Sequence, residues 1–443
     1  MKSYLDWSEY RDAGMGDAYA DIPKQGGDFA KAVAVCINSR RCENLAKGVM
    51  CPSFRLDENP SLSTGARVRL LKAALNGELG NGSMFTPELV EAMDLCVSCK
   101  GCQRECENNV DMSRIKIEYL AQLNASMGLS LRARLFSELP ELLAKRHWLI
   151  NLIAIRNRHP WIATLAERLL GISAKSPLPE PVEATRQYTL REIEGGQPVV
   201  LFADTFCKHY SPDILTAAVE VLQAVGCQVS LIGALDEKER YCCGRTYLSQ
   251  GRIEEARQQA EKLLKKLAPY AQRGIPLIGL EPSCLLTLRD EYRALGLGKM
   301  ADLVAGKAVL FEEFLAKGIK GSRLNLSWSE QAIAVQQPVV VHGHCHQKAV
   351  GAMKSMRKVL KQIPGVNFEM IEASCCGMAG SFGLEAEHYE TAKAMAEQAL
   401  LPTLGTRPEA LIVANGFSCR HQIETQTGRP ALHLAQLIRL IMA

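Results

Sequence analysis

The chain has 443 residues, of which 47% are hydrophobic and 23% are charged, an ordinary composition for a folded protein of two to four domains. Its formal net charge of +4, without a long basic run, argues against nucleic acid as a partner. No 18-residue apolar stretch predicts a membrane-spanning helix, and the N-terminal sequence lacks the apolar core of a secretory signal. The sixteen cysteines therefore predict metal ligands in a reducing, cytoplasmic compartment rather than disulfides.

A degenerate ligand run follows a polar N-terminal stretch. Residues 1–30 are expected to form an extended arm or an interface tail. The run then begins at Cys36 and Cys42, with Ser39 standing where a second cysteine would complete the pattern, and Cys51 follows, directly before a proline. This arrangement resembles an incomplete copy of the run described next.

The complete run comprises Cys96, Cys99, Cys102 and Cys106. The spacing C-x2-C-x2-C-x3-C is typical of a ferredoxin-type [4Fe-4S] cluster, because two residues between thiolates let a tight loop wrap three corners of a cube. A zinc site normally shows two separated cysteine pairs instead. Glu107 stands after Cys106, where two-cluster ferredoxins have a proline, which changes the turn without removing the thiolate.

Crossed ligation, in which the fourth cysteine of a run binds the other cluster, assigns the thiolates to two clusters. One cluster receives Cys96, Cys99, Cys102 and Cys51. The other receives Cys36, Cys42 and Cys106, and is either [3Fe-4S] or [4Fe-4S] with a non-cysteine ligand such as Ser39. We predict an α-helical ferredoxin domain over residues 31–120, with helices at 65–75 and from Pro87, the latter with Thr86 as N-cap.

Residues 121–185 predict a helical segment and a proline-rich linker. The stretch 147–161 combines aromatic, aliphatic and cationic residues. One interpretation is an amphipathic contact with a membrane surface or a quinone-bearing partner. The favoured interpretation is a helix that packs on its own domain.

Residues 198–325 and 337–443 predict two α/β lobes that arose by internal duplication. Each half places a cysteine, a Cys-Cys-Gly triplet and a last cysteine after successive strands, at spacings of 35 and 41 residues in the first half and 30 and 43 in the second. These residues should converge at the carboxyl edge of a parallel sheet, as metal ligands. They are Cys207, Cys242, Cys243 and Cys284 in the first lobe, and Cys345, Cys375, Cys376 and Cys419 in the second. Cys227 falls outside the repeat and is predicted to be a small buried hydrophobe.

A histidine-rich turn starts the second lobe. His342, His344 and His346 flank Cys345 and offer zinc or iron ligands, or proton carriers near neutral pH. The alternative is that some of them are structural histidines at a strand end. We expect a metal in the second lobe in particular, and take His344, His346 and Lys348 as candidate catalytic residues.

At these motifs the chain resembles the iron–sulfur component of FAD-linked 2-hydroxyacid dehydrogenases, over about residues 30–440. That family acts on D-2-hydroxyglutarate, D-lactate or glycolate, and is related to the anchor subunit of anaerobic glycerol-3-phosphate dehydrogenase. The Cys-Cys-Gly repeats also resemble those of heterodisulfide reductase. The most specific segments are 36–53, 96–102, 342–348 and 375–383.

The resemblance implies an electron-transfer subunit. It would pass electrons from an FAD-containing partner to quinone or another carrier, with the flavin held only by the partner and no activity alone. The chain would be a separate subunit or one half of a longer polypeptide, in the cytoplasm or at the cytoplasmic face of the membrane. The alternatives are direct catalysis at the Cys-Cys-Gly site, and a redox-sensing scaffold.

The repeats also depart from the heterodisulfide reductase pattern. Where the fuller motif ends in Cys-x2-Cys, this chain has Glu281 before Cys284 and Gly416 before Cys419, so each half keeps four cysteines instead of five. The sequence leaves three alternatives open: one ordinary cluster in each half, one mononuclear metal in each half, or one site shared by both halves.

Overall fold

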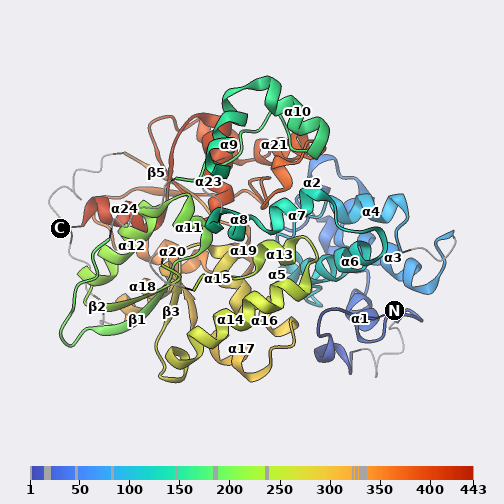
Figure 1. The fold of residues 1–443 in the computed structure, drawn as a ribbon, viewed down its shortest axis with the longest axis horizontal. Coiled ribbons are helices and arrows are strands. Elements are labelled where there is room, and N and C mark those ends of the chain that lie inside the picture. Colours follow the sequence, from blue (N-terminus) through green and yellow to red (C-terminus); the bar gives the residue numbers. More distant parts are fainter. Residues whose placement is uncertain are drawn as a thin grey trace.

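The computed structural model describes residues 2–13, 21–44, 48–80, 84–145, 148–182, 188–234, 239–321, 324, 328 and 337–442. Figure 1 shows the N-terminal helices gathered on one side of the molecule and the strands on the other. The domain limits expected at residues 1, 185, 325 and 443, and residue 147 of the aromatic stretch, lie outside the described residues.

The N-terminal domain is made of short helices between the ligand loops. They are η1 (Ser8–Tyr10), α1 (Asp28–Ala34), η2 (Arg41–Glu43), α2 (Phe54–Asp57), η3 (Pro60–Leu62), α3 (Thr64–Asn76), α4 (Pro87–Asp94), α5 (Gly101–Glu105) and α6 (Met112–Met127). Ser63 caps α3 by accepting from the Ala66 N–H, and Asp111 caps α6 by accepting from the Arg114 N–H. Thr86 does occupy the N-cap of α4, but its hydroxyl makes no capping hydrogen bond.

The first residues of the chain pack on α6 instead of extending into solvent. Leu5 and Trp7 are buried, and the fully buried carboxylate of Glu118 accepts hydrogen bonds from the Leu5 N–H (2.8 Å) and the Trp7 indole N–H (3.2 Å). A carboxylate surrounded by donors can be buried at low cost. This part of the expected arm is therefore a wall of the N-terminal domain.

Four helices connect the N-terminal domain to the sheets. They are α7 (Leu131–Ser137), α8 (Leu139–Lys145), α9 (Trp148–Arg158) and α10 (Pro160–Leu170). The predicted helical segment is thus divided into separate helices, and α9 and α10 lie at the upper edge of the molecule in Figure 1.

The first lobe contains a four-stranded parallel sheet in the order β2-β1-β3-β4. Its elements are β1 (Gln197–Phe202), α11 (Thr205–His209), α12 (Pro212–Ala224), β2 (Cys227–Ile232), α13 (Arg245–Ser249), α14 (Ile253–Gln272), β3 (Leu277–Gly279), α15 (Pro282–Arg289), α16 (Glu291–Ala294), α17 (Gly298–Ala305), β4 (Ala308–Leu310) and α18 (Phe311–Lys320). Cys227 begins β2 and is fully buried in an apolar core, as predicted.

The second lobe repeats this topology with the order β6-β5-β7-β8. Its elements are β5 (Val339–His342), α19 (Cys345–Ala349), α20 (Met353–Leu360), β6 (Phe368–Ile371), η6 (Phe382–Leu384), α21 (Tyr389–Glu397), α22 (Leu400–Gly405), β7 (Leu411–Val413), α23 (Phe417–Thr427), β8 (Ala431–Leu432) and α24 (Leu434–Ile441). The prediction of helical segments followed by two α/β lobes is confirmed at this level.

The parallel register brings the repeated cysteines to one edge of each sheet. In the second lobe, Val341 of β5 pairs with Val413 of β7, so the residues that follow both strands emerge together. Cys345 and Cys419 then lie in the first turns of α19 and α23. The cysteines therefore occupy helix starts beyond the strands rather than the strands themselves.

A buried histidine joins the N-terminal domain to the second lobe. The His388 ring lies 2.8 Å from the Asp94 carboxylate and 3.2 Å from the Glu385 carboxylate. Burial by itself would lower the pKa of His388, but the hydrogen bonds to Asp94 and Glu385 outweigh burial and raise the pKa to about 9. The imidazole is thus a cation at neutral pH.

We predict that this contact makes stability depend on alkaline pH. A histidine whose folded pKa exceeds its unfolded value of 6.5 stabilises fully below pH 6.5 and loses that contribution as the pH rises toward 9. His388→Gln should lower the unfolding free energy at pH 6.5 by about 1–3 kcal/mol and flatten its decline up to pH 9. Urea unfolding at a series of pH values measures both effects. In His421→Gln the slope should persist, because burial lowers the pKa of His421 and keeps it neutral there. An unchanged slope in His388→Gln would contradict the prediction.

Candidate metal centres

One cavity in the N-terminal domain collects four cysteines from two distant parts of the chain. Its wall includes Cys51, Cys96, Cys99 and Cys102. Cys51, Cys99 and Cys102 are buried, and burial raises the pKa of all three thiols, that of Cys51 to about 11. A metal must therefore displace protons from these thiols. Four sulfur donors around one enclosed space suit an iron–sulfur cluster.

Close backbone approach makes this convergence possible. A Cβ atom on Gly101 would lie only 3.0 Å from the Cα atom of Met50, the residue before Cys51. Cys51, Ser98 and Lys100 have positive φ angles of 53°, 49° and 61°. Such left-handed residues are uncommon outside glycine, and they cluster where a site constrains the backbone. The ligand loops are strained so that their sulfur atoms face one space.

A second cavity collects the three remaining N-terminal cysteines. Its wall includes Cys36, Cys42 and Cys106, together with Ser39 and Asn38. The structure thus brings Ser39 to the place where the sequence suggested a non-cysteine ligand. Asn38 was not anticipated from the sequence. Its side-chain oxygen already accepts a 2.6 Å hydrogen bond from Arg69.

The N-terminus of α3 lies between the two cavities and serves both. The Thr64 N–H donates to the Cys51 sulfur at 3.2 Å, and the next amide, of Gly65, donates to the Cys42 sulfur at 3.3 Å. The first amides of a helix have no intrahelical acceptor, and they favour negative charge. One helix start therefore supplies a hydrogen bond to a sulfur atom in each cavity.

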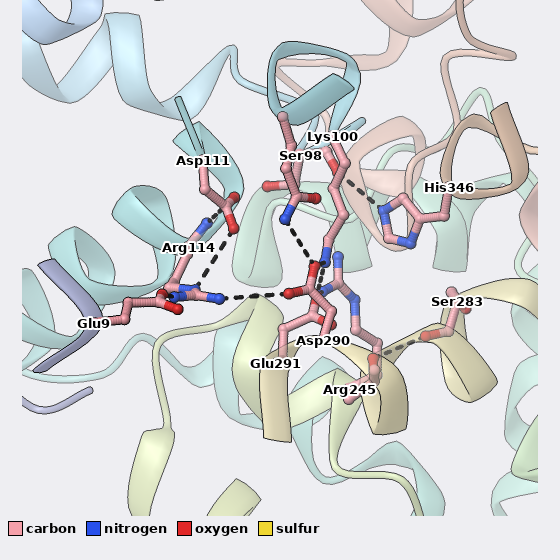
Figure 2. Close-up of polar contacts among 12 residues, drawn as sticks. Glu9, Ser98, Lys100, Asp111, Arg114, Arg245, Ser283, Asp290, Glu291 and His346 are labelled. Carbon is pink, nitrogen blue, oxygen red and sulfur yellow. Dashed lines mark hydrogen bonds and ion pairs between the residues drawn. The ribbon is translucent and has the colours of Figure 1, made fainter. Parts of the chain in front are cut away.

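The complete ligand run is clamped to the first lobe by a buried charge network (Figure 2). The Lys100 ammonium lies 2.5 Å from Asp290 and 2.9 Å from Glu291, and Arg245 lies 2.6 Å from Glu291. Arg114 reaches the other oxygen of Asp290 at 3.4 Å. Burial opposes ionisation of Asp290, but Lys100 and Arg114 outweigh it and lower its pKa to about 2. Every member of the network therefore has an opposite charge beside it.

In the second lobe, His342 lies among the thiols. One ring nitrogen of His342 and the sulfur atoms of Cys376 and Cys419 lie within 4.8 Å of one another. His342 is 1% exposed, and neither ring nitrogen has a hydrogen-bond partner among the described residues. A buried imidazole without partners requires an explanation, and a metal would supply it. Cys375 contacts both Cys345 and Cys376, which extends the donor set.

The other two histidines of the turn point elsewhere. The His344 ring caps α19 by accepting from the His346 N–H at 3.1 Å. His346 donates instead to the Ser98 carbonyl, at 3.0 Å, inside the complete ligand run of the N-terminal domain (Figure 2). Both rings have structural partners, so the structure brings only His342 of the three to the thiol cluster.

Lys348 lines a separate cavity of about 670 Å³ between the N-terminal domain and the second lobe. Its ammonium donates to the Ala373 carbonyl at 2.5 Å, and the Arg104 side chain donates to the Lys348 carbonyl. Arg41 lies on the same wall, together with the carboxylate of Glu105. Three cations and one carboxylate thus line this cavity, and Arg41 also pairs with Glu107 at 3.1 Å.

The first lobe groups three thiols and separates the fourth. Cys243 contacts both Cys242 and Cys284. The Cys207 thiol lies against the buried carboxyl of Asp204. The described part of this lobe supplies no histidine comparable to His342 to its cluster.

The glycine of each Cys-Cys-Gly triplet has a structural reason. Gly244 and Gly377 have φ angles of 78° and 86°. A Cβ atom on Gly377 would lie 1.9 Å from the Ala392 carbonyl oxygen of α21. Only glycine fits both the left-handed backbone and this contact. The amides of Gly244 and Gly377 also donate to the sulfur atoms of Cys242 (3.4 Å) and Cys375 (3.3 Å).

Sequence models of known families match three parts of the chain. A sequence model of the 4Fe-4S dicluster domain matches residues 35–111, and a model of the cysteine-rich domain matches residues 203–289 and again 339–424. The chain therefore contains one 4Fe-4S dicluster domain and two cysteine-rich domains. The family resemblance predicted from the motifs is confirmed.

Relatives of this iron–sulfur protein are oxidoreductases or components of them. A D-2-hydroxyglutarate dehydrogenase of Pantoea ananatis is 23% identical, in an alignment covering 95% of this chain and 44% of the relative. A component of the anaerobic glycerol-3-phosphate dehydrogenase of Escherichia coli is 26% identical over 64% of this chain and 70% of the relative. A component of the dihydromethanophenazine:CoB–CoM heterodisulfide reductase of Methanosarcina barkeri is 23% identical over 88% of each chain.

The chain spans less than half the length of the D-2-hydroxyglutarate dehydrogenases that it matches. The aligned part covers 36–44% of three of them. It carries domains typical of iron–sulfur proteins, and the relatives support a role in electron transfer. Sequence reasoning pointed to the cysteines that line these cavities but missed Asn38 and the network around Lys100. The only local sign of that network was a lysine inside the ligand run. This sign was not enough, because the acidic partners of Lys100 lie about 190 residues away.

We predict that Cys51 and the run at 96–102 hold one cluster. Cys51→Ser should abolish or convert the electron paramagnetic resonance signal of that cluster, because a corner thiolate of the shared cavity is lost. Anaerobically purified protein is required. Cys227→Ser is the matched control, since Cys227 is also buried but belongs to an apolar core. An unaltered spectrum in Cys51→Ser would reject the crossed assignment.

A second prediction concerns His342. His342→Leu should lower the metal content of the full chain, measured by inductively coupled plasma mass spectrometry, because it removes a nitrogen donor at similar volume. His346→Gln should retain that metal, because His346 bonds to the Ser98 carbonyl rather than to the thiol cluster. Equal metal content in wild type and both variants would exclude His342 as a ligand.

Proposed function

We propose that this protein relays electrons from an FAD-containing 2-hydroxyacid dehydrogenase to a quinone or another carrier. D-2-hydroxyglutarate, D-lactate and glycolate are the substrate candidates, and the flavin would belong to the partner or to another part of a longer polypeptide. The similarity to D-2-hydroxyglutarate dehydrogenases over 95% of this chain supports the class of partner. We further propose a reducing, cytoplasmic location, which fits sixteen free thiols.

The observation that carries the proposal is the contact between the complete ligand run and the second lobe. His346 of α19 donates to the Ser98 carbonyl, in the loop between Cys96 and Cys99. Burial raises the pKa of the Cys99 thiol, and Cys345 lies close enough for a charge on its sulfur to raise it further. Two groups of predicted ligands from different domains thus adjoin within one protein.

Backbone amides around the ligand run donate hydrogen bonds to its sulfur atoms. Bound iron–sulfur clusters would accept and donate single electrons. The amides of Thr64 and Gly101 donate to the sulfur atoms of Cys51 and Cys99, and they favour added negative charge there. Burial of Cys99 and Cys102 excludes water from the same space. These residues would raise the reduction potential and protect the site.

A second candidate function is direct reduction at the Cys-Cys-Gly site of the second lobe. It is favoured by the alignment with the heterodisulfide reductase component over 88% of both chains. The thiol cluster beside His342 would then be the reacting centre, with Lys348 lining a separate cavity. A redox-sensing scaffold is the remaining alternative from the sequence.

Reconstitution distinguishes these functions. We expect no dehydrogenase activity from the isolated chain, and quinone reduction only after a flavoprotein of this class and its hydroxyacid are added. Cys99→Ala should lower quinone reduction at least about a hundredfold while the flavin still reduces an artificial dye, because only the relay is broken. Cys227→Ser should leave both rates unchanged.

Turnover by the isolated chain would lead to the opposite conclusion. If it reduced a disulfide without a flavoprotein, the catalytic candidate would replace the relay. If Cys99→Ala lowered dye reduction and quinone reduction equally, the flavoprotein itself would depend on this residue and the relay would be refuted.

A further inference from the structure

The helices α9 and α10 expose an unusual number of large apolar side chains. Six residues form this surface, which we call the apolar face, and their exposed fractions are 52% for Trp148, 49% for Leu152, 42% for Ile155, 68% for Trp161, 47% for Leu165 and 72% for Leu169. The other exposed large hydrophobic residues are scattered over the rest of the described chain. Single exposed apolar residues are normal, but a contiguous group marks a binding surface.

The spacing of these residues shows that they share one side of each helix. In α9 they recur at intervals of four and three residues, and in α10 at intervals of four and four. Residues three or four apart lie on the same side of an α-helix. The two helices contact each other and lie at the upper edge of the molecule (Figure 1).

Polar contacts of Arg156 and Asn157 hold the C-terminal end of α9 against the protein. The Arg156 guanidinium is buried and donates to the carbonyl oxygens of Ser173 and Ser176, the latter at 2.8 Å. Asn157 accepts from the Leu178 N–H at 3.0 Å and donates to its carbonyl at 2.8 Å. In α10 the inward residue is Ala163, which is 5% exposed. These contacts fix the orientation of the helix pair, so the apolar face points outward.

The charge of this region identifies the chemistry of its partner. Residues 145–170 contain five basic side chains and a single acidic one, Glu167. Of the five, Arg156 is buried and Lys145 pairs with Glu141 at 3.1 Å. Glu167 also accepts a 2.6 Å hydrogen bond from the Ala174 N–H, whereas Arg158 and Arg168 are exposed beside the apolar face. An apolar face flanked by cations complements an anionic lipid surface.

The dimensions allow the helices to lie on a bilayer but not to cross it. Each has 11 residues and is about 16 Å long, roughly half the thickness of a bilayer's hydrocarbon core. None of the described helices combines the length and apolarity needed to cross a membrane. Exposed tryptophans suit the headgroup region, where an amphipathic ring contacts both lipid tails and water.

We propose that α9 and α10 dock this protein onto an anionic membrane surface through the apolar face. The proposal goes beyond electron transfer and is independent of it. It also favours the membrane interpretation of the 147–161 stretch, which the sequence alone ranked second. The structure describes residues 148–161 of that stretch. The membrane would then hold the protein at the surface where an apolar electron carrier resides.

Vesicle sedimentation tests the proposal on the full chain purified without oxygen. Wild type should bind vesicles of phosphatidylcholine that contain roughly 30% phosphatidylglycerol, a content typical of an anionic membrane. It should bind pure phosphatidylcholine vesicles weakly or not at all. Its binding to the anionic vesicles should decrease in high salt. The double variant Trp161→Glu, Leu169→Glu should bind at least about tenfold less, because each substitution puts a charge where an apolar side chain would insert.

The matched control is Leu440→Glu, which adds the same kind of charge at a side chain that is 58% exposed on α24, outside the helix pair. It should bind like wild type, and iron content and absorbance should show that all variants retain their sites. The proposal falls if wild type does not bind anionic vesicles, or if Leu440→Glu loses binding equally. It also falls if the double variant instead dissociates a dimer in light scattering or loses only its flavoprotein, because the face would then bind protein.

Discussion

The ion pairs of Lys100 determine how the rest of this protein can be arranged. A buried ammonium is costly unless carboxylates compensate for it, and Asp290 and Glu291 do so from the first lobe. Since Lys100 stands between Cys99 and Cys102, the position of the ligand loop is tied to that lobe. The same loop receives the hydrogen bond from His346 of the second lobe. The N-terminal domain therefore cannot move away from either lobe without unpairing buried groups.

Sulfur atoms in all three domains receive hydrogen bonds from backbone amides. The donors include Thr64 and Gly65 at the start of α3, and Gly244 and Gly377 after the paired cysteines. Their positions follow from backbone geometry, through helix starts or left-handed residues, rather than from side chains that a substitution could replace. The chemistry of the sulfur atoms is thus set largely by the fold itself.

The sequence predicted the repeated topology and the cysteine groups because both depend on short-range patterns. Cysteine spacing revealed the run at 96–106, and the repeated order of the cysteines over 198–325 and 337–443 indicated two α/β lobes of one topology. Long-range contacts left no such signal. Nothing near Lys100 indicated Asp290, and nothing near His388 indicated Asp94. All three histidines of 342–346 were candidate metal ligands from the sequence, and only the packing of α19 separates the one among thiols from the two with structural partners.

The cavity shared by Cys51 and the run at 96–102 has a consequence for biosynthesis. Its two walls lie 45 residues apart in the chain, so the space does not exist while the first wall alone has left the ribosome. Until the second wall follows, Cys36, Cys42 and Cys51 are exposed thiols on a nascent polypeptide. A metal cluster in this cavity would therefore require synthesis to proceed beyond residue 102, and a fragment that ends before that point would carry reactive cysteines without the cavity.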